Sequence, residues 1–349
     1  MLKPKISICI PTYNRADSLR NCLNSISIAE KNYAGHFEVC VSDNGSDDNT
    51  PNTVKQMGQS LKINYHRNET NFGIPRNFIQ VVSMAKGEFV WLIGDDDLLL
   101  PDTFDRLLPL LTDHEDIDFF YLNSFHLDRS CVDSKPHPFD TRNLPLAMKP
   151  FSEKKDSEEL EFFELIDPKV SFDFLGGMFL SAFRKSKWDA IVDRIDLQAI
   201  NSSETFSHFD NTFPHLKIWA NAFSKSRAYF NARPMNVCIT GYREWAPLEP
   251  LVRNIRLVEA LDTYKVNGMP YWRYIRCKNF ALRNYFSGVL MMVVNKNIYG
   301  FKLNLFKHYL SCALYPNVYL SFFYFLFRRI KALSSNSNSK MENFNESNR

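Results

Sequence analysis

Residues 89–101 read FVWLIGDDDLLLP, an apolar run that ends in three adjacent aspartates before a second apolar run begins. Carboxylates crowded between apolar segments repel one another and lose hydration, so the cluster is costly unless something compensates for it. At a strand end, side chains two residues apart point the same way, so Asp95 and Asp97 can face one point while Asp96 turns aside. Two converging carboxylates offer the oxygen ligands that Mg²⁺ and Mn²⁺ prefer. We therefore predict a divalent cation site; the alternative is a solvated turn before a helix capped by Asp102.

The first 125 residues alternate strand and helix patterns around this stretch. Strands are predicted at residues 5–10, 37–41, 63–66, 88–93 and 118–122, and helices at 19–28, 53–61, 75–85 and from 102 onward. Such alternation is typical of an α/β fold with a mostly parallel sheet flanked by helices. In such sheets ligands bind beyond the carboxyl ends of the strands. Three strands end in polar loops, which we expect to converge at one edge: PTYNR at 11–15, SDNGSDD at 42–48 and GDDD at 94–97.

The rest of the chain is less regular. Residues 128–150 contain four prolines and predict a long loop. Beyond the loop, a helix is predicted at 152–166, a strand at 178–183, a helix near 186–195 and a strand at 237–240. From about residue 246 to 333 the pattern is helical, and the Ser/Asn-rich residues 334–349 predict a disordered tail.

The composition restricts the classes of partner. A hydrophobic content of 45% supports a large core, and a net charge of +3 is too small to indicate a nucleic-acid binder. Seven cysteines without a CxxC pair indicate free thiols in a reducing compartment. The N-terminus lacks the pattern of a signal peptide, and no uncharged apolar run of about 18 residues predicts a transmembrane helix. We therefore expect a cytoplasmic protein.

The other two polar loops carry further candidates for ligand binding. Asp43, followed by Asn44, ends the second predicted strand and can accept hydrogen bonds from a base amide or a ribose hydroxyl; the alternative is an Asx-turn. In the first loop, Tyr13 offers a ring that can stack on a base, and Arg15 offers a guanidinium for phosphate. The alternative for this loop is a simple entry into the following helix.

Four segments in this order and spacing resemble glycosyltransferase family 2, whose members have a GT-A fold: PTYNR, VSDNGSDDNT, RNETNFGIPRN and AKGEFVWLIGDDDLLLPDTF. The resemblance covers residues 4–125 and, more weakly, 170–245. It implies an inverting transferase that uses a nucleotide-sugar donor and Mn²⁺ or Mg²⁺. Within the family, the sequence is similar to bacterial abequosyltransferase-like enzymes, which build surface polysaccharides such as O-antigen or capsule.

The resemblance also assigns residues to roles. It carries Asp43 to the nucleobase and Asp97 to the metal-binding DXD motif, whose first aspartate is either Asp95 or Asp96. It carries four residues of the first loop to the donor pocket: Pro11, Thr12, Tyr13 and Arg15. We predict Asn44, Asp95 and Asp96 as further binding residues of the same site. It implies a GT-A domain over 1–245, with a donor half at 1–125 and an acceptor half at about 150–245.

Inversion requires a carboxylate that takes the acceptor's hydroxyl proton, on the acceptor side of the site. Family members often carry a Glu-Asp pair at a helix start there, and this sequence has no clean pair. The best counterpart is SHFDNTFPH at 207–215, where Asp210 precedes an apolar helix at 213–223. We predict Asp210 as the base, with Glu204 as second choice; the alternative for Asp210 is a helix N-cap.

The acceptor implied by the resemblance is a saccharide or a lipid-linked saccharide. Residues 305–333 are apolar and aromatic and include Arg328, Arg329 and Lys331, a composition that suits an anionic bilayer surface. We therefore expect peripheral contact of this segment with the inner face of the cell membrane; the alternative is a buried helix of a C-terminal bundle.

Two other functions compete with a transferase. A sugar-nucleotide pyrophosphorylase would carry a Gly-rich basic loop after the first strand, where this chain has PTYNRADS. A non-catalytic scaffold of the same fold would fail to hydrolyse a nucleotide sugar in the presence of Mn²⁺. A dinucleotide-binding domain is disfavoured, because no GxGxxG follows the first strand.

Overall fold

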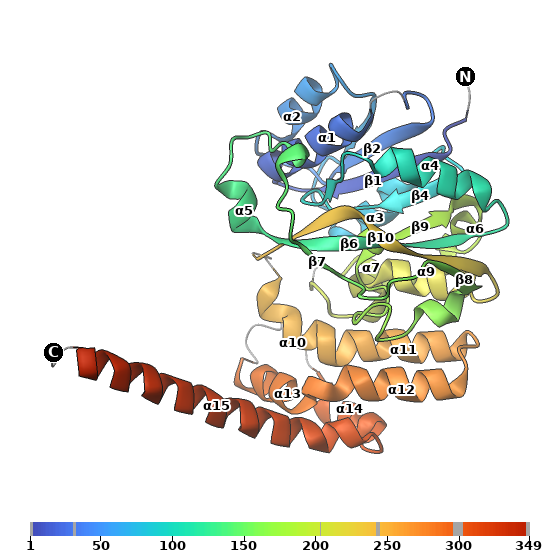
Figure 1. The fold of residues 1–349 in the computed structure, drawn as a ribbon. Helices are drawn as coiled ribbons and strands as arrows, with labels where there is room; N and C mark the ends of the chain where they lie inside the picture. Colours follow the sequence, from blue (N-terminus) through green and yellow to red (C-terminus); the bar gives the residue numbers. More distant parts are fainter. Residues whose placement is uncertain (1–2, 31–32, 203, 242–244, 296–302, 347–349) are drawn as a thin grey trace.

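The computed structural model describes residues 3–30, 33–202, 204–241, 245–295 and 303–346 (Figure 1). Within these ranges the chain forms one ten-stranded sheet flanked by helices, with a helical region packed beside it. The strands are β1 Ile6–Thr12, β2 Phe37–Asp43, β3 Ile63–Arg67, β4 Phe89–Leu92, β5 Leu98–Leu99, β6 Phe119–Asp128, β7 Lys149–Pro150, β8 Glu158–Glu161, β9 Ser181–Arg184 and β10 Arg227–Thr240.

The sheet has the order β3-β2-β1-β4-β9-β6-β10-β5, with β7 on β6 and β8 on β10. Strands β1 to β4, β6 and β10 run in one direction, and the four short strands β5, β7, β8 and β9 run against them. The predicted α/β class with a mostly parallel sheet is therefore confirmed. All residues of β1 and β4 are buried, as expected for parallel strands covered on both faces.

Helices cover the sheet and build the C-terminal region. Around the sheet lie α1 Ala16–Glu30, α2 Thr50–Met57, α3 Ile74–Ser83, α4 Thr103–Asp113, α5 Arg129–Asp133, α6 Lys185–Asp189, α7 Leu197–Ile200, α8 Phe209–Thr212 and α9 Pro214–Ala222. The C-terminal region contains α10 Glu249–Leu251, the π-helix η6 Val252–Arg256, α11 Leu257–Val266, α12 Tyr271–Ala281, the 3₁₀ turn η7 Leu282–Asn284, α13 Tyr285–Val294, α14 Leu305–Cys312 and α15 Pro316–Glu346.

The predicted helix at 152–166 is wrong. Its middle is β8, which pairs antiparallel with β10, and the 3₁₀ turn η2 (Phe162–Leu165) follows. The apolar residues Phe162, Phe163 and Leu165 are bunched at one end instead of being spaced along a helical face, and all three enter the core. Pairing with a long strand therefore outweighs the helix propensity of the glutamates. The strand predicted at 178–183 likewise starts later, at β9 after the turn η3 (Met178–Leu180).

Short antiparallel β9 joins the two halves of the sheet, because it lies between β4 and β6. Arg184 at its end donates hydrogen bonds to the carboxylates of Asp118 (2.7 Å) and Glu88 (2.5 Å), which flank those two strands. Trp91 of β4 donates from its ring nitrogen to the carbonyl oxygen of Phe179 at 2.8 Å, just before β9. Strand β9 is thus tied to β4 near both of its ends, by Arg184 at the amino end of β4 and by Trp91 toward the other end.

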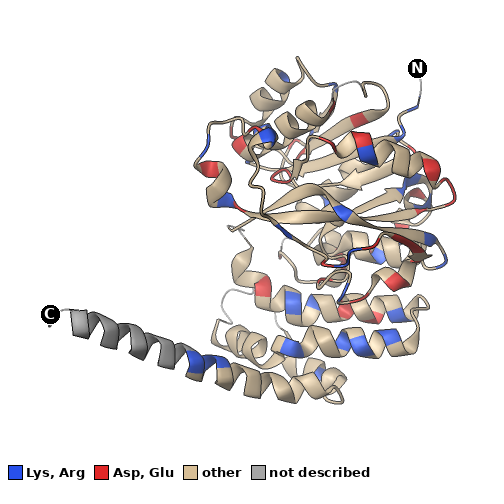
Figure 2. Ribbon diagram, in the orientation of Figure 1, with Lys and Arg blue, Asp and Glu red and all other residues tan. Residues whose placement is uncertain are grey.

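The seven cysteines are free, and the thiols of Cys9 and Cys40 are buried in neighbouring strands. Charged residues are scattered over α11 and α12, whereas α14 and the described side chains of α15 carry only basic charge (Figure 2). Helix α15 projects from the body in Figure 1 and runs to Glu346, into the segment for which disorder was predicted. The side chains after Lys331 lie outside the described part, and the disorder stays a prediction.

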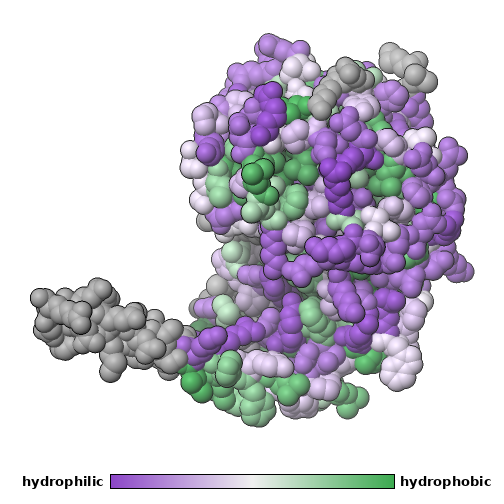
Figure 3. All heavy atoms as spheres, viewed as in Figure 1, coloured by the Kyte–Doolittle hydropathy of each residue, from purple (hydrophilic) through white to green (hydrophobic). Residues whose placement is uncertain are grey.

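Among the described helices, none is by itself long and apolar enough to cross a bilayer. The pair Leu305–Cys312 and Pro316–Lys331 meets that length and composition only when joined across a bend of 109°. The large apolar side chains of this pair are instead exposed at the surface, and hydrophobic residues gather at the bottom of the molecule in Figure 3.

Trp91 is expected to be a main support of the sheet beneath the aspartates. Trp91→Ala removes a fully buried ring and its hydrogen bond, and it should lower the free energy of unfolding by about 3–5 kcal/mol. Trp272→Ala is the control, because this ring is 82% exposed and its loss should cost less than about 0.5 kcal/mol. Urea denaturation of both variants checks the expectation, and equal midpoints would contradict it.

Candidate functional site

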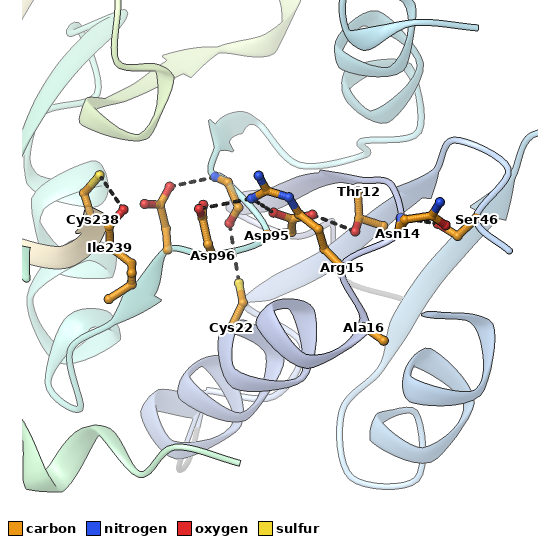
Figure 4. Close-up of polar contacts among 12 residues, drawn as sticks. Thr12, Asn14, Arg15, Ala16, Cys22, Ser46, Asp95, Asp96, Cys238 and Ile239 are labelled. Atoms are coloured by element: carbon orange, nitrogen blue, oxygen red, sulfur yellow. Dashed lines mark hydrogen bonds and ion pairs between the residues drawn. The ribbon is translucent and has the colours of Figure 1, made fainter. Parts of the chain in front are cut away.

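The three polar loops meet at the carboxyl ends of β1, β2 and β4, as predicted. Thr12 and Asp43 are register partners at the ends of β1 and β2. The hydroxyl of Thr12 donates to Oδ2 of Asp95 at 2.7 Å, which links β1 to the loop after β4. Residues from three separate segments thus share one polar corner of the sheet (Figure 4).

The aspartates lie in a turn just after β4, not on the strand end itself. The amide of Asp97 donates to the carbonyl oxygen of Gly94 (3.2 Å), and Oδ2 of Asp97 accepts from the Gly94 amide (2.7 Å). Asp95 and Asp97 are buried, whereas the side chain of Asp96 is 33% exposed. The convergence of Asp95 and Asp97 on one point stays a prediction. Arg15 bridges Asp95 and Asp96, at 3.3 and 3.2 Å (Figure 4).

The electrostatics of this turn favour a bound cation. Burial and the charge of Asp96 raise the pKa of Asp95 to about 7, against the opposing effect of Arg15 and Thr12. Burial, followed by the charge of Asp96, also raises the pKa of Asp97 well above its usual range. One guanidinium therefore leaves part of the repulsion uncompensated, and a divalent cation would relieve it.

The ligand set of the turn suits a cation that keeps open positions. Among the described residues, no group of three His, Cys, Asp or Glu side chains is arranged to hold a metal ion. Mg²⁺ and Mn²⁺ are commonly bound through one or two carboxylates, with water and substrate phosphates as the other ligands. The carboxylates of Asp95 and Asp97 fit that pattern and do not fit a closed structural metal site.

A cavity of about 650 Å³ opens beside the aspartates and connects three parts of the chain. Its lining includes predicted residues from the first half of the chain: Pro11, Thr12, Tyr13, Arg15, Asn44, Asp95, Asp96 and Asp97. It also includes Asp173, the glycines that follow it, and His215 from the second half. The helical region contributes Glu249, Arg253 and Arg283. The cavity is thus large enough for a small-molecule ligand, and its wall is mixed aromatic and polar.

Tyr13 and Asp43 differ in their access to this cavity. The ring of Tyr13 is 39% exposed and available for stacking. Asp43 is fully buried and does not line the cavity: its carboxylate accepts hydrogen bonds from the Tyr65 hydroxyl (2.6 Å) and the Ser46 amide (2.8 Å). This is the turn-stabilising alternative for Asp43, and its contact with a nucleobase stays a prediction.

Asp210 also does not line the cavity. It lies inside α8, and the N-cap of α9, the apolar helix that it was expected to cap, is Phe213, so the N-cap alternative is wrong. The Asp210 carboxylate is buried, accepts from the Asp196 amide at 2.8 Å and forms an ion pair with Lys217. The second choice, Glu204, is exposed and also lies outside the lining of the cavity.

Asp173 is the carboxylate that the sequence did not single out. It lines the cavity, accepts from the Gly177 amide at 2.8 Å and from the Ser171 hydroxyl, and its pKa is raised by burial. A Cβ on Gly177 would lie 3.0 Å from the Phe179 ring and 3.1 Å from Oδ2 of Asp173, so a side chain there would crowd both groups. The pair of glycines that follows Asp173 was the available signal.

His215 also lines the cavity, next to this loop. Burial lowers the pKa of His215 to about 4, so its imidazole is neutral at pH 7. A neutral imidazole can accept or donate one hydrogen bond without adding charge. This part of the cavity wall therefore presents one carboxylate and one neutral polar ring, and both can bind a hydroxyl group.

Comparisons with known proteins agree with this geometry. The family model described as Glycosyl transferase family 2 matches residues 7–157. Abequosyltransferase RfbV of Salmonella typhimurium is 29% identical over 297 residues, which cover 82% of this chain and 80% of RfbV.

Two solved structures share the fold. The S. aureus TarS structure in complex with UDP-GlcNAc has a TM-score of 0.56 at 17% identity, covering 81% of this chain and 73% of TarS. Mannosyltransferase PcManGT from Pyrobaculum calidifontis, in complex with GDP-Man and Mn²⁺, has a TM-score of 0.51 at 15% identity, covering 92% of this chain and 84% of PcManGT. Residues 7–157 match glycosyltransferase family 2, and the chain is a glycosyltransferase.

Proposed function

We propose that this glycosyltransferase moves a sugar, with inversion, from a nucleotide-sugar donor to a saccharide or lipid-linked saccharide acceptor in bacterial surface polysaccharide synthesis. The observation that carries the proposal is the single cavity that joins Asp95 and Asp97 to the acceptor side at Asp173. The similarity to an abequosyltransferase supports the polysaccharide context, O-antigen or capsule. The UDP-GlcNAc and GDP-Man of the two structural neighbours support a nucleotide-sugar donor.

On the donor side, each residue has a separate task. Tyr13 stacks on the nucleobase, with Pro11 shaping the same wall, and Asn44 lies at the edge of the cavity beside it. The Thr12 hydroxyl fixes the orientation of Asp95. Arg15 supplies a guanidinium next to the diphosphate. The Mn²⁺ of the PcManGT complex supports a divalent cation, Mn²⁺ or Mg²⁺, held by Asp97 and Asp95. When bound, such a cation neutralises charge on the departing diphosphate.

On the acceptor side, the hydroxyl proton needs a base within reach. Asp173 is partly buried, lines the cavity and has a raised pKa, and all three properties suit a general base. We therefore propose Asp173 as the base that takes the hydroxyl proton of the acceptor, and we keep Asp210, which was predicted from the sequence, as the alternative. The pairing of Asp210 with Lys217 suits a different task, which is to fix the entry of α9 next to His215.

The exposed surface of the C-terminal helices supports a location at the membrane. Large apolar side chains are exposed along α13, α14 and α15, and we name them the apolar face: Val294, Phe306, Leu310, Phe323, Phe327 and Ile330. Residues 305–331 contain no Asp or Glu, and Lys307, Arg328, Arg329 and Lys331 supply positive charge. This combination suits an anionic bilayer surface. It supports a cytoplasmic enzyme bound peripherally to the inner face of the cell membrane.

The donor and the cation can be tested together. A panel of nucleotide sugars, screened by thermal shift with and without Mn²⁺, should give one donor whose stabilisation depends on Mn²⁺. With that donor, Asp97→Asn should abolish the Mn²⁺-dependent gain in affinity and lower transfer by at least about a hundredfold. Asp113→Asn, at an exposed carboxylate of α4, is the control. Wild-type turnover by Asp97→Asn would refute the cation site.

The general base can be tested with two matched variants in which an aspartate is replaced by asparagine. Asp173→Asn should lower kcat by about 10²–10⁴ while donor affinity is unchanged, because only the proton acceptor is lost. Asp210→Asn should mainly lower the melting temperature, because it removes the partner of Lys217. The reverse result, with normal kcat for Asp173→Asn and a large loss for Asp210→Asn at unchanged melting temperature, would return the role to Asp210.

Membrane contact can be tested on the intact chain. Phe323 and Phe327 are 63% and 66% exposed and lie one helical turn apart. Replacing both with Ser should weaken flotation with vesicles containing phosphatidylglycerol by at least about tenfold. Leu146→Ser, at an exposed leucine outside the helical region, should leave flotation unchanged. Equal flotation of the double variant and wild type would rule out the apolar face as the contact.

A further inference from the structure

Three arginines from separate elements gather where the helical region meets the cavity. Arg253 of η6 and Arg283 of η7 both line the cavity that contains the aspartates. Arg328 of α15 donates a hydrogen bond at 3.1 Å to Oδ1 of Asn284, which is another residue of the cavity wall. One cavity is thus lined both by the aspartates and by Arg253 and Arg283, and Arg328 contacts its wall through Asn284.

Carboxylates of the described residues balance only part of the positive charge of this arginine cluster. Arg253 forms an ion pair with Glu249 at 2.7 Å, and its guanidinium lies 5.9 Å from the centre of the Phe172 ring. Arg283 donates to the carbonyl oxygen of Phe280 at 3.1 Å and its guanidinium lies 4.0 Å from the centre of that ring. Within the described ranges, neither Arg283 nor Arg328 forms an ion pair with a carboxylate. Burial, followed by the charges of Arg253 and Arg328, lowers the pKa of Arg283. Arg283 therefore lies close enough to both arginines for their positive charges to act on it.

The cluster also lies beside the apolar face. Helix α15 packs against η7, and Arg328 directly follows the exposed Phe327. One ligand could therefore reach three environments at once: the sugar-binding cavity, the arginines and an apolar surface. Guanidinium groups bind phosphate oxygens through paired N–H donors, which makes phosphate the best-matched anion for this position.

We propose that Arg253, Arg283 and Arg328 bind the phosphate or diphosphate that joins the acceptor saccharide to its lipid chain. This inference rests on the proposed glycosyl transfer and makes its acceptor specific: a lipid-linked saccharide, not a free one. The arginines hold the linking phosphate where the cavity meets the apolar face, the lipid follows the apolar face, and the saccharide extends toward Asp173.

The experiment measures binding of short probes to the full chain by calorimetry, in EDTA so that no cation can hold a diphosphate at the aspartates. Farnesyl diphosphate should bind at least about tenfold more tightly than farnesol or inorganic pyrophosphate. Arg283→Gln should remove that difference, and Arg283→Lys should restore part of it. Arg328→Gln should weaken binding, whereas Arg329→Gln, one residue further on the same helix, should not, because Arg329 lies over Phe325.

Each result has a defined meaning. Equal affinity of wild type and Arg283→Gln for farnesyl diphosphate would overturn the inference, as would equal loss in Arg328→Gln and Arg329→Gln. Binding of dihexanoyl-phosphatidylglycerol as tight as that of farnesyl diphosphate would assign the arginines to lipid headgroups and also overturn it. Mn²⁺-dependent donor stabilisation, measured in parallel on each variant, reports on the proposed transfer separately. The melting temperature of each unliganded variant shows whether it is folded.

Discussion

Buried negative charge at the end of β4 is the constraint on which the site depends. Two carboxylates are kept out of water in a tight turn: Arg15 and Thr12 contact Asp95, and the Gly94 amide and the Cys238 side chain contact Asp97. Holding them there requires a rigid frame, because a flexible turn would let them swing into solvent. Parallel strands buried on both faces supply that frame, and β9 extends it next to β4. Trp91 donates a hydrogen bond to Phe179 just before β9, and Arg184 ties β9 to the far end of β4.

The same frame brings distant parts of the chain to one cavity. Strand β9 comes from the second half of the chain but pairs with β4 of the first half, so the loop before it faces the aspartates. The glycines in this loop let Asp173 and the Phe179 ring pack closely. The helical region then covers the remaining side with polar and basic groups. The first half of the chain, the second half and the helical region therefore share one cavity, although the sequence pattern separates them.

The α/β class and the corner of polar loops could be predicted from the sequence, because both depend on local periodicity and on the rule that parallel strands end at one edge. The errors arise where distant packing decides. Pairing with β10 made a strand of residues predicted as helix. The packing of single side chains is likewise set by distant residues: Tyr65 bonds to Asp43, Asp210 pairs with Lys217, and no local pattern reveals that Asp173 lines the cavity. The arginine cluster joins residues 30 to 75 positions apart and has no sequence motif.

Arg15 links the aspartates to any anion that enters the cavity. Its guanidinium lies 3.3 Å from Oδ1 of Asp95 and 3.2 Å from Oδ2 of Asp96, and the side chain also lines the cavity. A cation that binds Asp95 would share that carboxylate with Arg15 and weaken the attraction between the two side chains. Cation binding and anion binding would then be coupled through this one side chain.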